Sequence, residues 1–429
     1  MTDRSQRPPS AFRLNLEQQK NRAKDLLRAA KGGAAEALAR ITLDETRPPQ
    51  PATVKLADAQ FAIARELRFA NWAQLKTHIE SMDRQRAAID QQAPPLDADM
   101  KTLHIRCGSD IRDGLAAGGF VGTFLEHSTP YCQGPVTLGP QRHELMAHYI
   151  TDTFGELKGG LKYPDVLHSL EQDDERLRRS ADDYERVVMW MEHDSYDQLV
   201  LARLLAHYAN ARRPRVLELI AVNEFPGGER FIGIGQLPSE ALRMLWPRRR
   251  TVTPTQLALG DQVWNAIAST DPAQLAALAR NGTPALPIMA PALQRHLREL
   301  PSVENGLSLT EHLILQILDE TAPQKMGRIL GLLTHAREPL PFMGDWGTFR
   351  RIEAMLAASE PVLIRTPAPQ GEPYFRQEVS ITDLGRAVLR GARDWLSLQS
   401  PSRWVGGVQI VPGRSAWRWD ESRRQPVRT

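Results

Sequence analysis

A group of ionisable side chains follows directly on an apolar run, Val-Val-Met-Trp-Met at 187–191. The next residues supply three carboxylates and an imidazole, from Glu192, His193, Asp194 and Asp197. The run is typical of a buried strand, and charges beside a core need a partner, a metal or solvent. Glu192, Asp194 and Asp197 are therefore candidate ligands of Mg²⁺ or Mn²⁺, and with His193 they are candidate catalytic acids and bases. A capped, negatively charged helix start explains the same residues equally well.

A second polar segment, Gly108, Ser109 and Asp110, follows a predicted strand at 102–107. At a helix start, backbone N–H groups and the helix dipole favour an anion such as phosphate. Gly108, Ser109 and Asp110 are candidate ligand-binding residues, although Ser109 or Asp110 can also be a simple N-cap.

A third segment follows a predicted strand at 216–222 and contains Glu224 and Arg230, of which Arg230 can clamp an anion. Tyr196 and Gln198, which lie among the acidic residues, complete the predicted ligand contacts. Ligands of parallel α/β sheets bind at the carboxyl ends of the strands, so we expect all three segments to share one edge.

These strands alternate with helical segments, a pattern that predicts βαβ units and a parallel sheet. The expected fold class is α/β, with a Rossmann-like domain at 100–252. No phosphate-binding Walker loop, dinucleotide fingerprint or nucleophile elbow occurs. The chemistry therefore depends on the strand-end residues.

Flanking segments have different compositions. They are a tail at 1–12, an N-terminal helical module at 13–83, a polar linker at 84–99, a helical connector at 253–305, a winged-helix-like α+β domain at 306–395 and an aromatic-rich extension at 396–429. In the winged-helix-like domain, Ser308 and Glu311 form a predicted capping box, and a two-stranded wing is expected. Its candidate recognition helix, 348–357, carries Arg350 and Arg351, which suit phosphates or guanine edges.

Several of these stretches resemble a bacterial family catalogued as domain of unknown function 1835, in its long form with a C-terminal extension. The resemblance covers roughly 100–420. It rests mainly on Gly108-Ser109-Asp110, Trp190-Met191-Glu192-His193-Asp194, Glu224-Phe225-Pro226-Gly227, Pro247-Arg248-Arg249-Arg250 and Arg403-Trp404-Val405-Gly406-Gly407. It implies the architecture and supplies no activity. The first helices are similar to the segment that precedes ankyrin repeats in many bacterial proteins, and no such repeats follow.

Composition narrows the classes of function. The formal charge of +3 over 429 residues does not favour a protein that binds nucleic acid over its whole surface. Two cysteines exclude a disulfide framework, and no apolar run reaches the length of a membrane span. We expect a cytoplasmic protein.

Three hypotheses remain. The favoured one is a site for a phosphate- or nucleotide-like small anion at the sheet edge, with a metal-dependent hydrolase or transferase as the enzyme class if there is catalysis. The alternatives are a winged-helix DNA-binding regulator and an interaction protein that docks a partner through residues 14–82.

Overall fold

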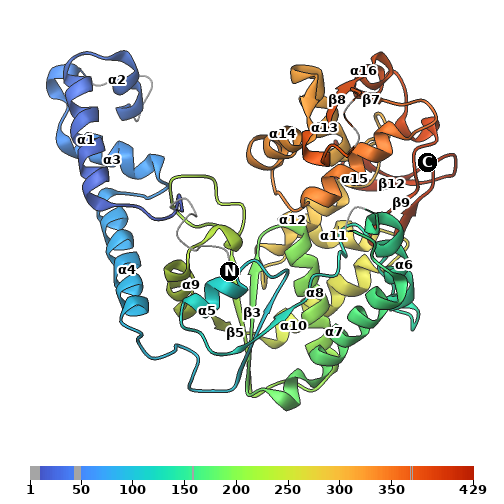
Figure 1. Cartoon of the computed structure of the whole chain (residues 1–429), viewed down its shortest axis with the longest axis horizontal. Helices are drawn as coiled ribbons and strands as arrows, with labels where there is room; N and C mark the ends of the chain where they lie inside the picture. The colour runs from blue at the N-terminus through green and yellow to red at the C-terminus, as the bar shows by residue number, and fades with distance from the viewer. Residues whose placement is uncertain (1–9, 43–49, 157–158, 368, 370) are drawn as a thin grey trace. The chain divides into compact units, whose positions relative to one another are not determined.

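The computed structural model describes residues 10–42, 50–156, 159–367, 369 and 371–429 (Figure 1). The chain forms two compact units. Unit 1 consists of residues 1–101, 110–122 and 222–249, and unit 2 consists of residues 102–109, 123–221 and 250–429. Of the predicted tail at 1–12, residues 1–9 lie outside the described residues. The predicted domain boundaries stay predictions.

Unit 2 is built on a five-stranded sheet with the order β2-β1-β3-β4-β5. Its strands are β1 (Thr102–Arg106), β2 (Thr123–Glu126), β3 (Arg186–Glu192), β4 (Val216–Val222) and β5 (Arg250–Thr251). Strand β1 is parallel to both β2 and β3, whereas β5 is antiparallel to β4. The sheet is therefore mixed. The expected parallel pairing is present between β1, β2 and β3, and the short edge strand β5 was not predicted.

Every residue of β1 and β3 is buried, as the unbroken apolar run in β3 predicts for a sheet covered on both faces. The helices of this part of unit 2 are α6 (Arg142–Phe154), α7 (Tyr163–Asp183), α8 (Ser195–Asn210), α10 (Pro254–Ile267), α11 (Ala273–Asn281) and α12 (Met289–Leu297). Helix α8 packs against β3, α10 and α12. It is buried around most of its circumference, and this fixes the end of β3 that precedes it.

A second core of unit 2 lies within 307–398. It joins α13 (Leu309–Thr321), α14 (Met326–Leu332), α15 (Asp345–Leu356) and α16 (Asp383–Leu389) to an antiparallel sheet, β6 (Gln324–Lys325), β8 (Glu378–Ile381) and β7 (Leu363–Arg365). The capping box is confirmed, since Ser308 and Glu311 exchange hydrogen bonds between side chain and backbone. The predicted two-stranded wing has a third strand, β6, which is too short to give a sequence signal.

The chain ends in two hairpins, β9 (Arg403–Val405) with β10 (Val408–Ile410) and β11 (Trp417–Asp420) with β12 (Gln425–Arg428). The buried residues Val405, Val408 and Trp419 belong to the main core of unit 2. The aromatic-rich extension is thus part of the folded unit.

Unit 1 is mainly helical. It contains α1 (Leu16–Lys31), α2 (Ala35–Ile41), α3 (Leu56–Glu66), α4 (Trp72–Asp90), α5 (Arg112–Ala117) and α9 (Ser239–Leu245). Helix α4 continues to Asp90, so the first part of the predicted linker is helical. The extra turns are held by contacts with α9, including Arg86 to Glu240. Phe12, at the end of the predicted tail, is buried against Phe225 and Phe231.

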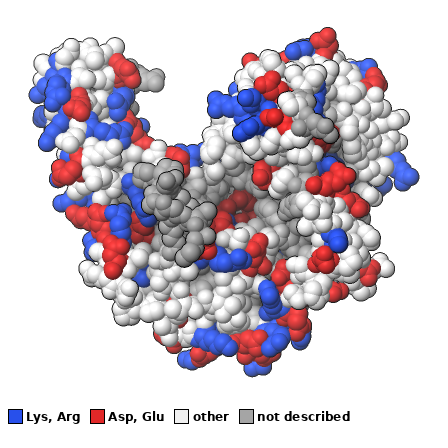
Figure 2. Space-filling view, viewed as in Figure 1, with Lys and Arg blue, Asp and Glu red and all other residues white. Residues whose placement is uncertain are grey.

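Among the described residues, none of the helices combines the length and the apolar character that crossing a bilayer requires. On the face drawn in Figure 2, basic and acidic side chains intermingle. No extended basic surface dominates that face.

Candidate functional site

The order in which the strands are added to the sheet reverses at β1, although β1, β2 and β3 are parallel. From β1 the chain passes to β2 on one side and then to β3 on the other, and the register pairs Arg106 with Trp190. The carboxyl ends of β1 and β3 are therefore neighbours. Gly108 and Ser109, which follow β1, and Glu192, which ends β3, lie at the same edge of unit 2. In open α/β sheets, such a switch point is where ligands bind.

Three carboxylates gather at this edge. Glu192, Asp194 and Asp197 each place an oxygen within 4.8 Å of the others. All three side chains are buried, with residue exposures of 7%, 5% and 2%. The set matches the candidate metal ligands predicted from the sequence, and carboxylate oxygens are what Mg²⁺ and Mn²⁺ prefer.

Arg106, at the end of β1 and 2% exposed, is the buried counter-charge of this cluster. Its Nη2 lies 3.0 Å from a Glu192 oxygen, and its Nη1 donates to Asp197 Oδ1. The same Asp197 oxygen accepts the backbone N–H of Glu192 at 2.8 Å. Sequence patterns did not single out Arg106, because an arginine inside a strand gives no sign of what it faces.

The start of α8 sets the positions of the acids. Asp194 is the N-cap, and its Oδ1 accepts the backbone N–H of Asp197 at 2.9 Å. Gln198 donates to the Glu192 carbonyl, and the Tyr196 hydroxyl donates to the Ser128 carbonyl. Tyr196 and Gln198 thus hold the backbone around the acids, and His193 is half-buried. The helix-cap interpretation of the acidic segment is correct, and it does not exclude a second role.

Asp194 differs from the other two acids in its electrostatics. Burial raises its pKa well above the ordinary value, and the negative charges of Asp197 and Glu192 raise it further. Arg106 opposes this rise but forms its ion pairs with the other two carboxylates. A cation beside Asp194 would favour its ionised form.

The remaining predicted ligand residues, Asp110, Glu224 and Arg230, belong to unit 1. The Asp110 carboxyl lies so close to Gly235 that a side chain there would collide with it. Glu224 is exposed, and the Arg230 carbonyl accepts a hydrogen bond from Gln236. Because these three residues belong to unit 1, the expectation that they share one edge with the acidic residues of unit 2 stays a prediction.

A cavity that the sequence did not reveal lies beyond the end of β2. It is lined by His127, Thr129, Tyr131, Pro135, Val136, Thr137, Arg142, His143, Met146, Leu170, Asp174, Arg203 and Trp264. The lining comes from the loop after β2 and from α6, α7, α8 and α10. His127 and His143 have no metal-ligand spacing along the chain, and only the packing of these helices brings them together.

Asp174 organises the polar side of this cavity. Its carboxylate accepts hydrogen bonds from Arg142 Nη2 at 2.5 Å and Arg203 Nη2 at 3.0 Å, and it lies 3.0 Å from His143 Nε2. Burial alone would raise the pKa of Asp174, but Arg203 and Arg142 outweigh it and lower that pKa to about 2. Asp174 is therefore ionised at neutral pH.

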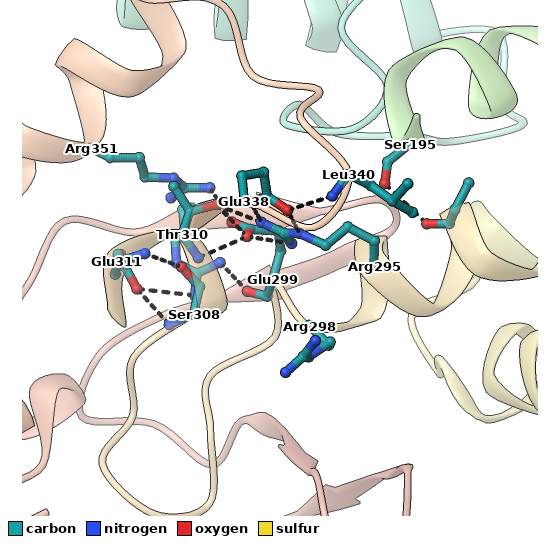
Figure 3. Close-up of polar contacts among 12 residues, drawn as sticks. Ser195, Arg295, Arg298, Glu299, Ser308, Thr310, Glu311, Glu338, Leu340 and Arg351 are labelled. Carbon is teal, nitrogen blue, oxygen red and sulfur yellow. Dashed lines mark hydrogen bonds and ion pairs between the residues drawn. The ribbon is translucent and has the colours of Figure 1, made fainter. Parts of the chain in front are cut away.

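The arginines of the predicted recognition helix have different surroundings. Arg351 is 11% exposed at its side chain, and its Nη2 lies 3.5 Å from Glu299. Figure 3 shows the buried network to which it belongs, where Arg295 binds Glu299, Glu338 and Thr310. Arg350 is partly exposed. Helix α15 also contacts α6. Of the two predicted nucleic-acid contacts, Arg351 is thus engaged inside unit 2.

Comparisons with protein-family models, with curated proteins and with solved structures find no match to this chain. The resemblance described above rests on the quoted residues alone. Function is therefore inferred from the geometry of unit 2.

Proposed function

We propose that unit 2 binds a divalent cation, Mg²⁺ or Mn²⁺, at the carboxyl ends of β1 and β3, and through it a phosphate- or nucleotide-like anion. A metal-dependent hydrolase or transferase is the enzyme class that such a site would serve. The observation that carries the proposal is the gathering of Glu192, Asp194 and Asp197 at the switch point of the sheet. The same proposal includes a Rossmann-like fold for the domain that carries this sheet.

In this proposal Glu192, Asp194 and Asp197 ligate the cation, and Arg106 keeps two of the carboxylates in place. An anion could not approach three buried carboxylates by itself, because like charges repel, so the cation must come first. Ser109, exposed in the turn after β1, meets the anion, and His193 acts as acid or base.

The test is calorimetric titration of the full chain with Mn²⁺. Asp194→Asn keeps an N-cap side chain but removes the charge. We expect this variant to lose Mn²⁺ binding, whereas Asp165→Asn, which changes an exposed acid in the first turn of α7, keeps it. Equal binding by the native protein and Asp194→Asn would leave the acids with a structural role only.

A second candidate function is DNA binding by the region 309–381. Its element order, α13-β6-α14-α15-β7-β8, and its sheet order, β6-β8-β7, favour a winged-helix-like domain. The engagement of Arg351 by Glu299 weakens this candidate. Titration with duplex DNA at several salt concentrations tests it, since phosphate contacts give a steep loss of affinity with salt. Docking of a protein partner on residues 14–82 is a third proposal.

A further inference from the structure

The cavity beyond β2 is lined by a buried histidine with a ring nitrogen that has no hydrogen-bond partner among the described residues. His127 is 1% exposed and lines the cavity. Its Nε2 lies 3.3 Å from the Tyr131 hydroxyl, while its Nδ1 is buried and has no hydrogen-bond partner among the described residues. A buried nitrogen without a partner costs roughly 1–3 kcal/mol. A ligand atom in the cavity would remove that cost.

The neighbours of His127 indicate which kind of atom this would be. The Tyr131 hydroxyl, 3.3 Å from His127 Nε2, can donate its proton to that nitrogen. A neutral imidazole that accepts at Nε2 carries its proton at Nδ1. In that tautomer Nδ1 is a donor that calls for an acceptor such as an oxyanion, and Arg142 and Arg203 in the lining favour the same kind of ligand.

The charges of the lining determine how negative the ligand can be. Arg142 and Arg203 are positive and Asp174 is negative, so the lining carries one net positive charge while the histidines are neutral. Both arginines use Nη2 to bind Asp174. One negative charge on a ligand gives a neutral site, whereas a phosphate dianion would leave an excess negative charge beside Asp174.

The rest of the lining is apolar. Val136, Met146, Leu170 and Trp264 face the same space. The cavity has a volume of about 390 Å³ when the solvent at its mouth is counted. The occupant is therefore small, with one apolar side.

From these features we propose that the cavity binds the carboxylate of a small organic acid that carries a short apolar side chain, with His127 and the two arginines on the carboxylate and Val136, Met146, Leu170 and Trp264 on the side chain. This site is separate from the proposed cation site and depends neither on a metal nor on the function proposed above.

The experiment is calorimetric titration of the full chain in EDTA at slightly alkaline pH, with 3-methylbutanoate, acetate and inorganic phosphate as probes. We expect 3-methylbutanoate to bind roughly tenfold more tightly than acetate, because its extra carbons are buried, and inorganic phosphate to bind least. His127→Phe should weaken 3-methylbutanoate binding at least about tenfold through loss of the donor. Arg142→Gln, at a partly exposed position that tolerates change, should weaken it as well.

An exposed control, Arg215→Gln, should bind 3-methylbutanoate like the native protein. Tighter binding of phosphate than of 3-methylbutanoate would overturn the carboxylate assignment. Absence of 3-methylbutanoate binding, or equal binding by native protein and both cavity variants, would overturn the site itself. None of these outcomes bears on Mn²⁺ binding, which is measured without EDTA.

Discussion

The backbone N–H of His127 donates to the carbonyl of Arg106 at 2.9 Å. This hydrogen bond joins the residue that lines the cavity beyond β2 to the residue that neutralises the acids at the end of β3. The two candidate sites of unit 2 are therefore joined by a backbone hydrogen bond at the carboxyl edge of the sheet. Because the contact is between main-chain atoms, side-chain variants at either residue leave it in place.

Arg106→Met should destabilise the protein by about 3–5 kcal/mol, because Glu192 and Asp197 would stay buried without this counter-charge. Urea unfolding of the variant and the native protein gives the difference directly. A loss below about 1 kcal/mol, typical of an exposed pair, would mean that the acids are already neutral or solvated.

The cap of α8 gives a second prediction, at Asp194. Asp194→Asn should be at least as stable as the native protein at neutral pH, because asparagine still caps the helix and the unfavourable buried charge is gone. Asp194→Ala loses the cap and should be about 1 kcal/mol less stable than Asp194→Asn. Urea unfolding without added metal measures both, and the reverse order of stability would contradict this account of the helix start.

The free energy of unfolding should fall as the pH is lowered from about 6.5 to about 4. These two values are the ordinary pKa of histidine and the native pKa of two buried histidines. Burial lowers the pKa of His127 and of His296 to about 4, so the unfolded chain binds these protons first as the pH falls. The contribution of each buried, neutral histidine to the free energy of unfolding is fully present above the ordinary pKa. It is lost as the pH falls towards the native pKa, by roughly 3 kcal/mol for each histidine. Thermal unfolding across this range should show the slope.

His296→Phe should make that slope shallower, since both ring nitrogens of His296 are buried and have no hydrogen-bond partner in the part of the chain that the structure describes. His168→Phe, at an exposed position on α7, is the matched control and should keep the native slope. If the two variants behave alike, the acid sensitivity comes from other groups.

The network in Figure 3 gives a fourth prediction. Arg295 makes two hydrogen bonds of 2.7 Å to Glu338 and one of 2.9 Å to Glu299. Arg295→Met should cost about 3–5 kcal/mol, because it leaves two buried carboxylates with fewer partners. Arg298→Met, which breaks a more exposed pair with Glu421, should cost less than about 1 kcal/mol. Similar losses for both variants in urea unfolding would contradict the central place given to Arg295.

Patterns within one segment were predictable from the sequence. The apolar run at 187–191 predicts β3, and Ser308 with Glu311 predicts the start of α13, because both signals are local. The acidic segment was predictable for the same reason. His104 lies inside β1 as a buried histidine, and its Nδ1 accepts a hydrogen bond from Trp190 at 3.2 Å.

Features that depend on packing between distant segments were not predictable. Arg106 and Asp197 are far apart in the sequence, and only the β1–β3 register brings them together. Asp174 lies on an amphipathic helix where an acid is ordinary, and its importance comes from arginines on α6 and α8. Strands as short as β5 and β6 carry no periodicity.

The most direct test of the proposed cation site is a crystal structure of the full chain grown with Mn²⁺, with anomalous scattering recorded for manganese. If Glu192, Asp194 and Asp197 form a cation site, one peak lies within coordination distance of their oxygens. A map without a peak there, at a concentration of Mn²⁺ that loads other sites on the protein, would contradict the proposed cation site.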